Sequence, residues 1–194
     1  MVPYATSWLA LTVAVALRPQ WLMRLDSDLR QAIRLPELAA PSRILTNAGD
    51  PLVILSLSLC LLGVLASWRQ WDRVKLAAGA LAAVALFRWG VLWLLERARP
   101  PDAMAEALGW SYPSGHTAYS LTAALIFYFF VEPTLRQPWQ HAALLTFVVA
   151  WPLTVAVTRV QLGVHWPIDV LAGWLLPLII LPMVVNIAKS DARR

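Results

Sequence analysis

Six long apolar blocks, separated by short polar connections, constrain this chain more than any other feature of its sequence. A helix needs about 20 residues to cross the hydrocarbon core of a membrane, with a range of roughly 17–25. The blocks come close to this length and cover residues 2–17, 51–68, 76–95, 114–131, 142–157 and 167–188. Backbone groups in lipid must find their hydrogen bonds within the segment, so each block is expected to be a helix. The sequence predicts an all-α integral membrane bundle of six transmembrane helices, forming a single domain over residues 1–194.

Composition agrees with a membrane protein and argues against a nucleic-acid-binding one. Charged residues make up only 14% of the chain, whereas a soluble domain usually carries about 25%. The tryptophans gather at opposite block ends, as expected for indole rings at two membrane interfaces: Trp21, Trp110 and Trp166 at one end, and Trp68, Trp71 and Trp139 at the other. The net charge of +5 comes mostly from basic residues at block ends rather than from a basic stripe. No nucleic-acid partner and no obligate protein partner are expected.

The connection between the first two blocks, residues 18–50, is too long to be a simple turn. Within it Leu25, Leu29 and Ile33 recur at spacings of four. This period predicts an amphipathic helix lying on the membrane surface. Such a helix could form a lid or substrate entrance, or it could be a plain surface connector, and the sequence leaves both open.

An even number of spans places both termini on the same side of the membrane. The segments sharing that side are residues 69–75, residues 132–141 and the tail from Lys189, and together they carry seven basic and three acidic residues. An excess of Lys and Arg is typical of cytoplasmic segments. We therefore expect cytoplasmic termini in a bacterial inner (plasma) membrane, with the opposite face outside, towards the periplasm.

Three polar clusters lie at block ends on that outer face. They are residues 97–100 after the third block, residues 113–116 at the start of the fourth, and Thr158, Arg159, His165 and Asp169 around the junction of the fifth and sixth. Alternating topology, which follows from the apolar blocks alone, brings all three to the same side of the membrane. The sequence therefore predicts that the clusters converge on one site.

The first set of residues in these clusters suits a phosphate group. Arg99 and Arg159 are permanently charged, and their planar guanidinium groups match phosphate oxygens. Ser114 and Gly115 open a helix, where free backbone N–H groups form an anion site, and the glycine lets a ligand approach the backbone closely. Ser114 can cap the helix or donate to the phosphate.

The second set of residues suits nucleophilic catalysis. His165 and Asp169 are four residues apart, so the carboxylate can accept a proton from one ring nitrogen and leave the other unprotonated. The unperturbed pKa of histidine, about 6.5, makes the neutral ring accessible. His116 could then protonate the departing oxygen.

Taken together, these stretches resemble the signature of the type 2 phosphatidic-acid phosphatase superfamily, which also includes vanadium-dependent haloperoxidases. That signature reads Lys-x6-Arg-Pro, Pro-Ser-Gly-His and Ser-Arg-x5-His-x3-Asp, and the resemblance covers the third to sixth blocks. It implies a phosphohistidine mechanism without metal or cofactor, in which His165 is the nucleophile, Asp169 orients it and His116 is the acid. The residues it implies for phosphate binding are Arg99, Arg159, Ser114 and Gly115.

Two positions depart from this signature. Thr158 replaces the family serine and keeps the hydroxyl, whereas Leu92 stands where the family has a lysine. Arg88 lies one helical turn before Leu92, on the face of the third block that also carries Arg99. Our hypothesis is that Arg88, or less favourably Arg97, partly replaces the lysine; the alternative is an arginine that snorkels or pairs structurally.

The expected function is therefore hydrolysis of a lipid phosphate or diphosphate ester. Polyprenyl diphosphate, phosphatidate, phosphatidylglycerol phosphate and lipid A all have headgroups at a suitable depth, and the sequence does not separate them. A lipid phosphotransferase is a related alternative. A catalytically silent lipid-phosphate-binding protein is another, suggested by Leu92, whereas a haloperoxidase is disfavoured because those relatives are soluble.

Overall fold

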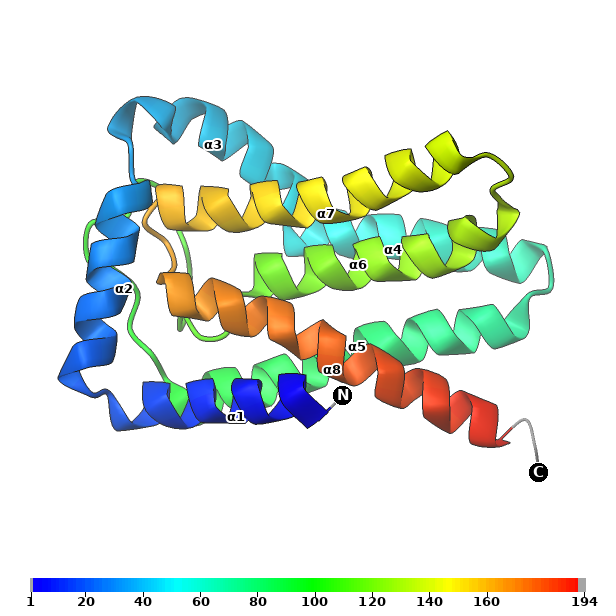
Figure 1. The fold of residues 1–194 in the computed structure, drawn as a ribbon, viewed down its shortest axis with the longest axis horizontal. Coiled ribbons are helices and arrows are strands. Elements are labelled where there is room, and N and C mark those ends of the chain that lie inside the picture. Colours follow the sequence, from blue (N-terminus) through cyan, green and yellow to red (C-terminus); the bar gives the residue numbers. More distant parts are fainter. Residues whose placement is uncertain (1, 192–194) are drawn as a thin grey trace.

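The fold is all-α, as the sequence predicted. The computed structural model describes residues 2–191, with side chains from Tyr4 to Ile187, and within this part of the chain it contains helices and no strand. The α-helices are α1 (Val2–Leu17), α2 (Gln20–Ile33), α3 (Ala39–Thr46), α4 (Pro51–Ser67), α5 (Trp71–Leu95), α6 (Gly115–Val131), α7 (Pro138–Gln161) and α8 (Pro167–Asp191). Three short 3-10 helices, η1 (Pro36–Leu38), η2 (Asn47–Gly49) and η3 (Glu132–Thr134), connect some of them. Figure 1 shows the long helices running roughly side by side.

Each of the six apolar blocks contains a long helix, although some bounds differ from those expected. The largest difference is in α7, which begins at Pro138 and ends at Gln161 instead of covering residues 142–157. The side chains of Gln137 and Gln140 form a capping box and Pro138 occupies the first turn, which favours a helix start at this point. Polar residues outside the apolar block therefore set the start of this helix.

Four helical stretches among the described residues are long and apolar enough to cross a membrane, and they make the chain an integral membrane protein. They are Pro36–Ser67, Trp71–Leu95, Pro138–Gln161 and Pro167–Ile187. The first helix is shorter, and α6 has 17 residues, several of them buried and polar. The six-span arrangement therefore stays a prediction.

Helix α6 lies inside the bundle, in contact with α4, α5, α7 and α8 (Figure 1). Gly173 of α8 allows a close approach between α8 and the start of α6. A Cβ atom at Gly173 would lie only 2.7 Å from the carbonyl oxygen of Ser114, well inside van der Waals contact. The N-terminus of α6 is thereby held directly against the first turns of α8, and this junction positions the site.

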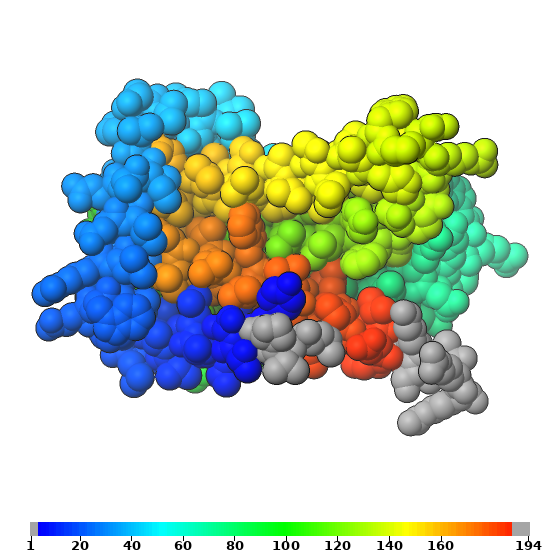
Figure 2. Space-filling view, in the orientation of Figure 1, coloured from blue at the N-terminus to red at the C-terminus, as the bar shows by residue number. Residues whose placement is uncertain are grey.

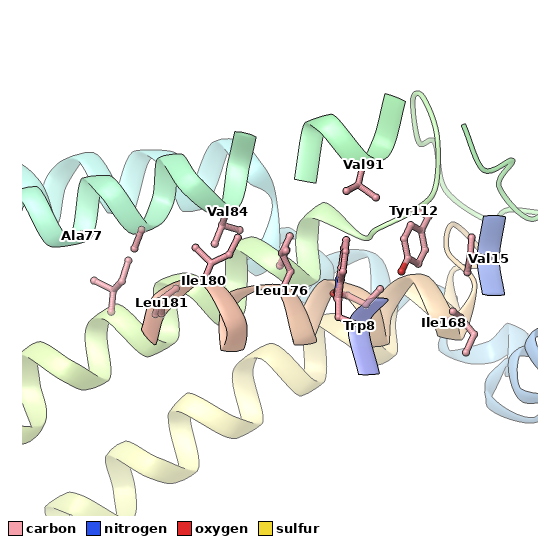
Figure 3. Close-up of a cluster of buried hydrophobic side chains, with 14 of the residues drawn as sticks. Trp8, Val15, Ala77, Val84, Val91, Tyr112, Ile168, Leu176, Ile180 and Leu181 are labelled. Atoms are coloured by element: carbon pink, nitrogen blue, oxygen red, sulfur yellow. The ribbon is translucent and has the colours of Figure 1, made fainter. Parts of the chain in front are cut away.

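The largest core cluster packs α1 and α5 against α8 (Figure 3). Trp8 of α1 is buried there, and its indole N–H donates to the carbonyl of Ala172 at 3.2 Å. Tyr112 is fully buried beside it and shares a 2.8 Å hydrogen bond with Thr12. Buried indole and phenol groups need such partners. The first bond ties α1 to α8, and the second ties the segment before α6 to α1.

Helices α2 and α3 cover one end of the bundle, as Figure 2 shows for its blue and cyan atoms. In α2, Leu22 is buried, whereas Leu25, Leu29 and Ile33 are exposed. A helix therefore occupies the predicted segment, and the three apolar residues that recur every four positions face outwards. That these residues rest on a membrane remains a prediction.

Candidate active site

The three polar clusters meet at the end of the bundle that α2 and α3 cover. The C-terminal ends of α5 and α7 and the N-terminal ends of α6 and α8 come together here (Figure 1). Between them lies a cavity of about 700 Å³. Of the residues expected in the site, those that line it are Arg88, Arg99, Gly115, His116, Arg159 and His165. We call this space the cationic cavity, because three buried or half-buried arginines face it.

His165 lies in the loop between α7 and α8 and is buried. Its Nε2 atom is 3.2 Å from a terminal nitrogen of Arg99. Because a guanidinium group can only donate, Nε2 must be the unprotonated nitrogen and Nδ1 carries the proton. Nδ1 lies 3.5 Å from the Oδ2 atom of Asp169 and has no hydrogen-bond partner among the described residues. The lone pair of Nε2 is thus on the side of the cationic cavity, and the N–H is on the side of the carboxylate.

The environment of His165 favours its neutral form. Burial, followed by the positive charges of Arg159 and Arg99, lowers the pKa of His165 well below 6.5. An uncharged ring is the form that can act as a nucleophile. The electrostatics therefore suit the role that the sequence suggested.

Asp169 is held more firmly than its spacing from His165 indicated. It is fully buried in the first turn of α8, where Oδ2 accepts the backbone N–H of Trp166 at 2.9 Å. Oδ1 accepts from Arg97 at 2.5 Å. Its carbonyl oxygen accepts the N–H of Ser114 at 3.0 Å, which ties α8 to the start of α6. The carboxylate is thus fixed before any substrate binds.

Arg99 has no unused donor. Its five N–H groups donate to the carbonyl oxygens of Leu108, Gly109, Trp110 and Val164 and to Nε2 of His165. That Arg99 binds phosphate stays a prediction. In this structure Arg99 first of all holds the loop before α6, and only the N–H directed at His165 lies against a nucleophilic atom.

Arg159 has a hydrogen-bond donor that is not used. It is 5% exposed, one terminal nitrogen donates to the hydroxyl of Thr46 at 3.1 Å, and its Nε–H has no partner among the described residues. A buried, unpaired guanidinium N–H is costly, so an anion in the cavity would satisfy it.

Arg88 reaches the N-terminus of α6. Its Nε donates to the carbonyl of Pro113 at 3.2 Å, and its guanidinium group lies over the rings of Trp89 and Tyr119. A Cβ atom at Gly115 would come within 2.8 Å of Arg88 Nε. Gly115 therefore leaves room for this guanidinium group as well as for a ligand. Leu92, at the family lysine position, lines the same cavity.

His116 lies in the first turn of α6, and its Nε2 atom is 3.8 Å from Oδ2 of Asp50. Ser114 makes no side-chain cap bond; its hydroxyl accepts from Thr117 at 3.0 Å. Thr158 donates to the carbonyl of Val155 within its own helix. Ser114 and Thr158 are thus placed beside the cavity without lining it.

Sequence reasoning missed Asp26, Thr46 and Asp50. Asp50 caps α4 through Oδ1, which accepts the N–H of Leu52 at 2.8 Å, and its position before Pro51 is the usual signal of a helix start. Nothing in the sequence connected Asp26, 71 residues from Arg97, to the site. No group of three or more His, Cys, Asp or Glu side chains in the described chain is arranged to hold a metal ion.

The fold and the site define a class: a helical membrane protein with a buried histidine–carboxylate pair beside a cationic cavity. Within that class the chain belongs to the PAP2 superfamily, whose profile matches residues 3–191. The type 2 phosphatidic-acid phosphatase resemblance is thereby confirmed. Leu92 and Thr158 are departures within a shared framework.

Curated relatives match parts of the chain. Phosphatidylglycerophosphatase B of Haemophilus influenzae is 31% identical over 84 residues, which are 43% of this chain and 35% of that protein. Undecaprenyl-diphosphatase of Sulfolobus acidocaldarius is 43% identical over 68 residues, or 34% of this chain and 28% of that protein. Phosphatidylglycerophosphatase B of Bacillus subtilis is 33% identical over 106 residues, about half of each chain. The chain thus spans half or less of the curated relatives it matches.

Two solved structures share the fold. The transmembrane PAP2-type phosphatidylglycerolphosphate phosphatase from Bacillus subtilis superposes with a TM-score of 0.84 at 24% identity, covering 97% of this chain and 96% of that one. Aquifex aeolicus LpxE superposes with a TM-score of 0.64 at 23% identity, covering 84% and 95%. At these identities the likeness concerns the fold alone.

Proposed function

We propose that the protein is a lipid phosphatase that hydrolyses a phosphate or diphosphate ester through a phosphohistidine intermediate. One observation carries this proposal: the unprotonated Nε2 of His165 adjoins a cavity shared with His116 and three arginines. The curated relatives are themselves named as phosphatases of lipid substrates, which supports the same reaction class.

In the first step the lone pair of His165 Nε2 forms a bond to phosphorus as the bond from phosphorus to the lipid oxygen breaks. His116 gives a proton to that departing oxygen. A phosphate ester therefore leaves as a lipid alcohol, and a diphosphate ester leaves as a lipid monophosphate. The Nδ1–H of the phosphorylated ring stays directed at Asp169, whose negative charge stabilises the new imidazolium. This is general-acid and nucleophilic catalysis divided between two imidazoles.

In the second step water attacks phosphorus, and the bond between Nε2 and phosphorus breaks with its electron pair returning to the ring. The water proton returns to His116 and inorganic phosphate is released. Both steps place negative charge on the equatorial oxygens, and fixed cationic donors aimed at such charge are usually the largest catalytic contribution.

The arginines divide this work. Arg159 would donate its unpaired Nε–H to the phosphate, and Arg88 would supply the cation that the lysine supplies in the family signature. The Arg99 N–H that now donates to Nε2 would pass to a phosphate oxygen once phosphorus occupies that position. Ser114 and Gly115 would contribute through the helix N-terminus, and no metal or cofactor takes part.

An apolar rim beside the cavity favours a lipid-linked phosphate. Leu52 of α4 is 74% exposed and Leu108 is 95% exposed, and both line the cavity. Trp89 and Trp93 of α5 line it as well and are exposed. Such side chains suit an acyl or prenyl chain better than water. Polyprenyl diphosphates, phosphatidate, phosphatidylglycerol phosphate and lipid A remain the candidate substrates.

We also propose that this end of the bundle lies on the outer, periplasmic face of a bacterial inner membrane, with the termini cytoplasmic. The support is the excess of basic residues in the loops at the opposite end. The substrate would then be drawn from the outer leaflet.

The decisive experiment measures phosphate release from a panel of these lipids by the purified protein. Wild type is expected to turn over at least one of them, to be inhibited by vanadate and to be unaffected by EDTA. The variant His165→Ala should lose activity by several orders of magnitude, whereas His141→Ala should not, because His141 pairs with Glu132 outside the cavity. Loss of activity in chelator would contradict the metal-free mechanism.

The same assay separates the alternative functions. A phosphotransferase would transfer label from a radioactive donor lipid to an acceptor hydroxyl rather than to water. A catalytically silent protein would bind the lipid phosphate but would release no inorganic phosphate from it. The presence of both histidines and the aspartate in one site argues for turnover.

A further inference from the structure

Arg97 connects two buried carboxylates that come from opposite ends of the sequence. One terminal nitrogen donates to Oδ1 of Asp169 at 2.5 Å, and the other donates to Oδ2 of Asp26. Both aspartates are fully buried and Arg97 is 12% exposed. We call these three residues the Asp26 cluster.

Asp26 also holds the start of α8. Its second oxygen, Oδ1, accepts the backbone N–H of Ile168 at 2.9 Å. Ile168 directly precedes Asp169, so Asp26 fixes the backbone of that turn as well as the arginine that grips its carboxylate. The Arg97 guanidinium group lies against the ring of Trp166.

The charges in the Asp26 cluster do not cancel. Arg97 alone would neutralise Asp169, and the N–H of His165 would then face an overall neutral pair. Each oxygen of the two carboxylates accepts an N–H, which is the pattern of the ionised form. With Asp26 included, one positive and two negative charges therefore leave a net charge of −1 behind the ring. On its other side His165 faces the cationic cavity, with Arg88 from α5, Arg99 and Arg159.

We propose that Asp26 is a positioning residue for catalysis, which offsets the charge of Arg97 and so keeps the cluster behind His165 negative. This inference rests on the proposed phosphohistidine chemistry. During that chemistry the ring of His165 becomes an imidazolium bonded to phosphorus. A negative cluster stabilises that cation more than it stabilises the neutral ring, so it accelerates the chemical step more than it strengthens binding.

The test compares three variants in the lipid phosphatase assay. Asp26→Asn keeps an oxygen for Ile168 but removes the charge, and kcat should fall on the order of 10–100-fold while KM stays within about twofold. Asp28→Asn, on the exposed side of the same helix, should match wild type. In the double variant Asp26→Asn/Arg97→Gln the cluster regains a net charge of −1 from Asp169, and kcat should recover part of the loss.

The double variant distinguishes a role of the Asp26 charge from purely structural support. If Asp26 acted only structurally, a second substitution in the cluster would lower kcat further. Unchanged kcat in Asp26→Asn, or a double variant less active than Asp26→Asn, would overturn the inference. Size-exclusion profiles and helical circular dichroism confirm that each variant remains folded before its rates are compared.

A second readout keeps this inference separate from the proposed function. The chain has only three histidines, so ¹⁵N-histidine NMR of the wild type and His165→Ala assigns the ring of His165. The wild type should show the Nδ1-protonated tautomer, and Asp26→Asn should shift it towards a mixture. If the wild type released phosphate from no lipid, the proposed function would fail, and an unchanged tautomer in Asp26→Asn would then refute the role of Asp26 independently.

Discussion

The Nε2 atom of His165 accepts a hydrogen bond from Arg99 at 3.2 Å. Because arginine has only donors, this contact favours the tautomer in which Nε2 is unprotonated and Nδ1 carries the proton. It also places a guanidinium N–H beside the atom that would attack phosphorus. A residue outside the histidine–carboxylate pair therefore helps to orient the ring of His165.

Replacement of Arg99 by lysine should not preserve activity. Three of the five N–H bonds of Arg99 hold the loop at residues 108–110, and an ammonium group offers three donors from a single point. Arg99→Lys is expected to lower kcat/KM about 10²–10³-fold. Arg136→Lys, at the opposite end of the bundle, is the matched control. Near-normal kcat/KM in Arg99→Lys would show that only the charge matters.

The charge of Arg88 should matter more than its shape. Arg88→Ala removes a cation from the cationic cavity and is expected to reduce phosphate release about 10²–10³-fold. Arg88→Lys restores the residue type that the family signature places one turn later, so it should retain more activity than Arg88→Ala. Arg73→Ala tests the same helix far from the site, where Arg73 contacts Phe130. Equal rates for wild type and Arg88→Ala would refute the replacement hypothesis.

Gly115 should not tolerate even one methyl group. Its new Cβ would meet Arg88 Nε at 2.8 Å and displace the guanidinium group. A misplacement of about 1 Å can cost about 10²-fold in rate, so Gly115→Ala should lose activity on the order of 10–100-fold. Gly90→Ala is the control, because nothing lies within 4 Å of a Cβ at Gly90. Measured kcat values of the two variants should therefore differ widely although both remain folded.

The stability of the protein should decrease on acidification because of His165. Burial, and then Arg159 and Arg99, lower the pKa of His165 in the folded state. Below about pH 6.5 the unfolded chain therefore binds the proton more readily, and the free energy of unfolding falls by up to about 1.4 kcal/mol per pH unit. The free energy of unfolding is therefore unaffected by His165 above the pKa that this histidine has in the unfolded chain, and it decreases as the pH falls below that value.

The melting temperature of the detergent-solubilised protein, followed from about pH 7 down to about pH 5, checks this sign. The decrease should be smaller in His165→Gln, which cannot take up the proton. His141→Gln keeps His165 and should follow the wild-type curve. A wild-type melting temperature that falls no more steeply on acidification than that of His165→Gln would contradict the prediction.

The sequence by itself determined where the helices lie and at which end the chemistry gathers. Apolar block lengths located the long helices, and alternation of the chain across a bilayer brought Arg99, His116 and His165 to one end. These features depend on local composition and on chain direction, which need no knowledge of packing. The start of α7 differed because Gln137 and Gln140 cap it outside the apolar block.

Only the tertiary structure decided which partner each polar side chain takes. Arg97 binds both Asp26 and Asp169, Arg99 holds its own loop, and Gly115 leaves space for Arg88. These contacts depend on how each helix is rotated and how closely it packs, and they join residues as much as 72 positions apart. A buried charge accepts whichever partner the packing provides, because leaving it unpaired costs more than any local preference.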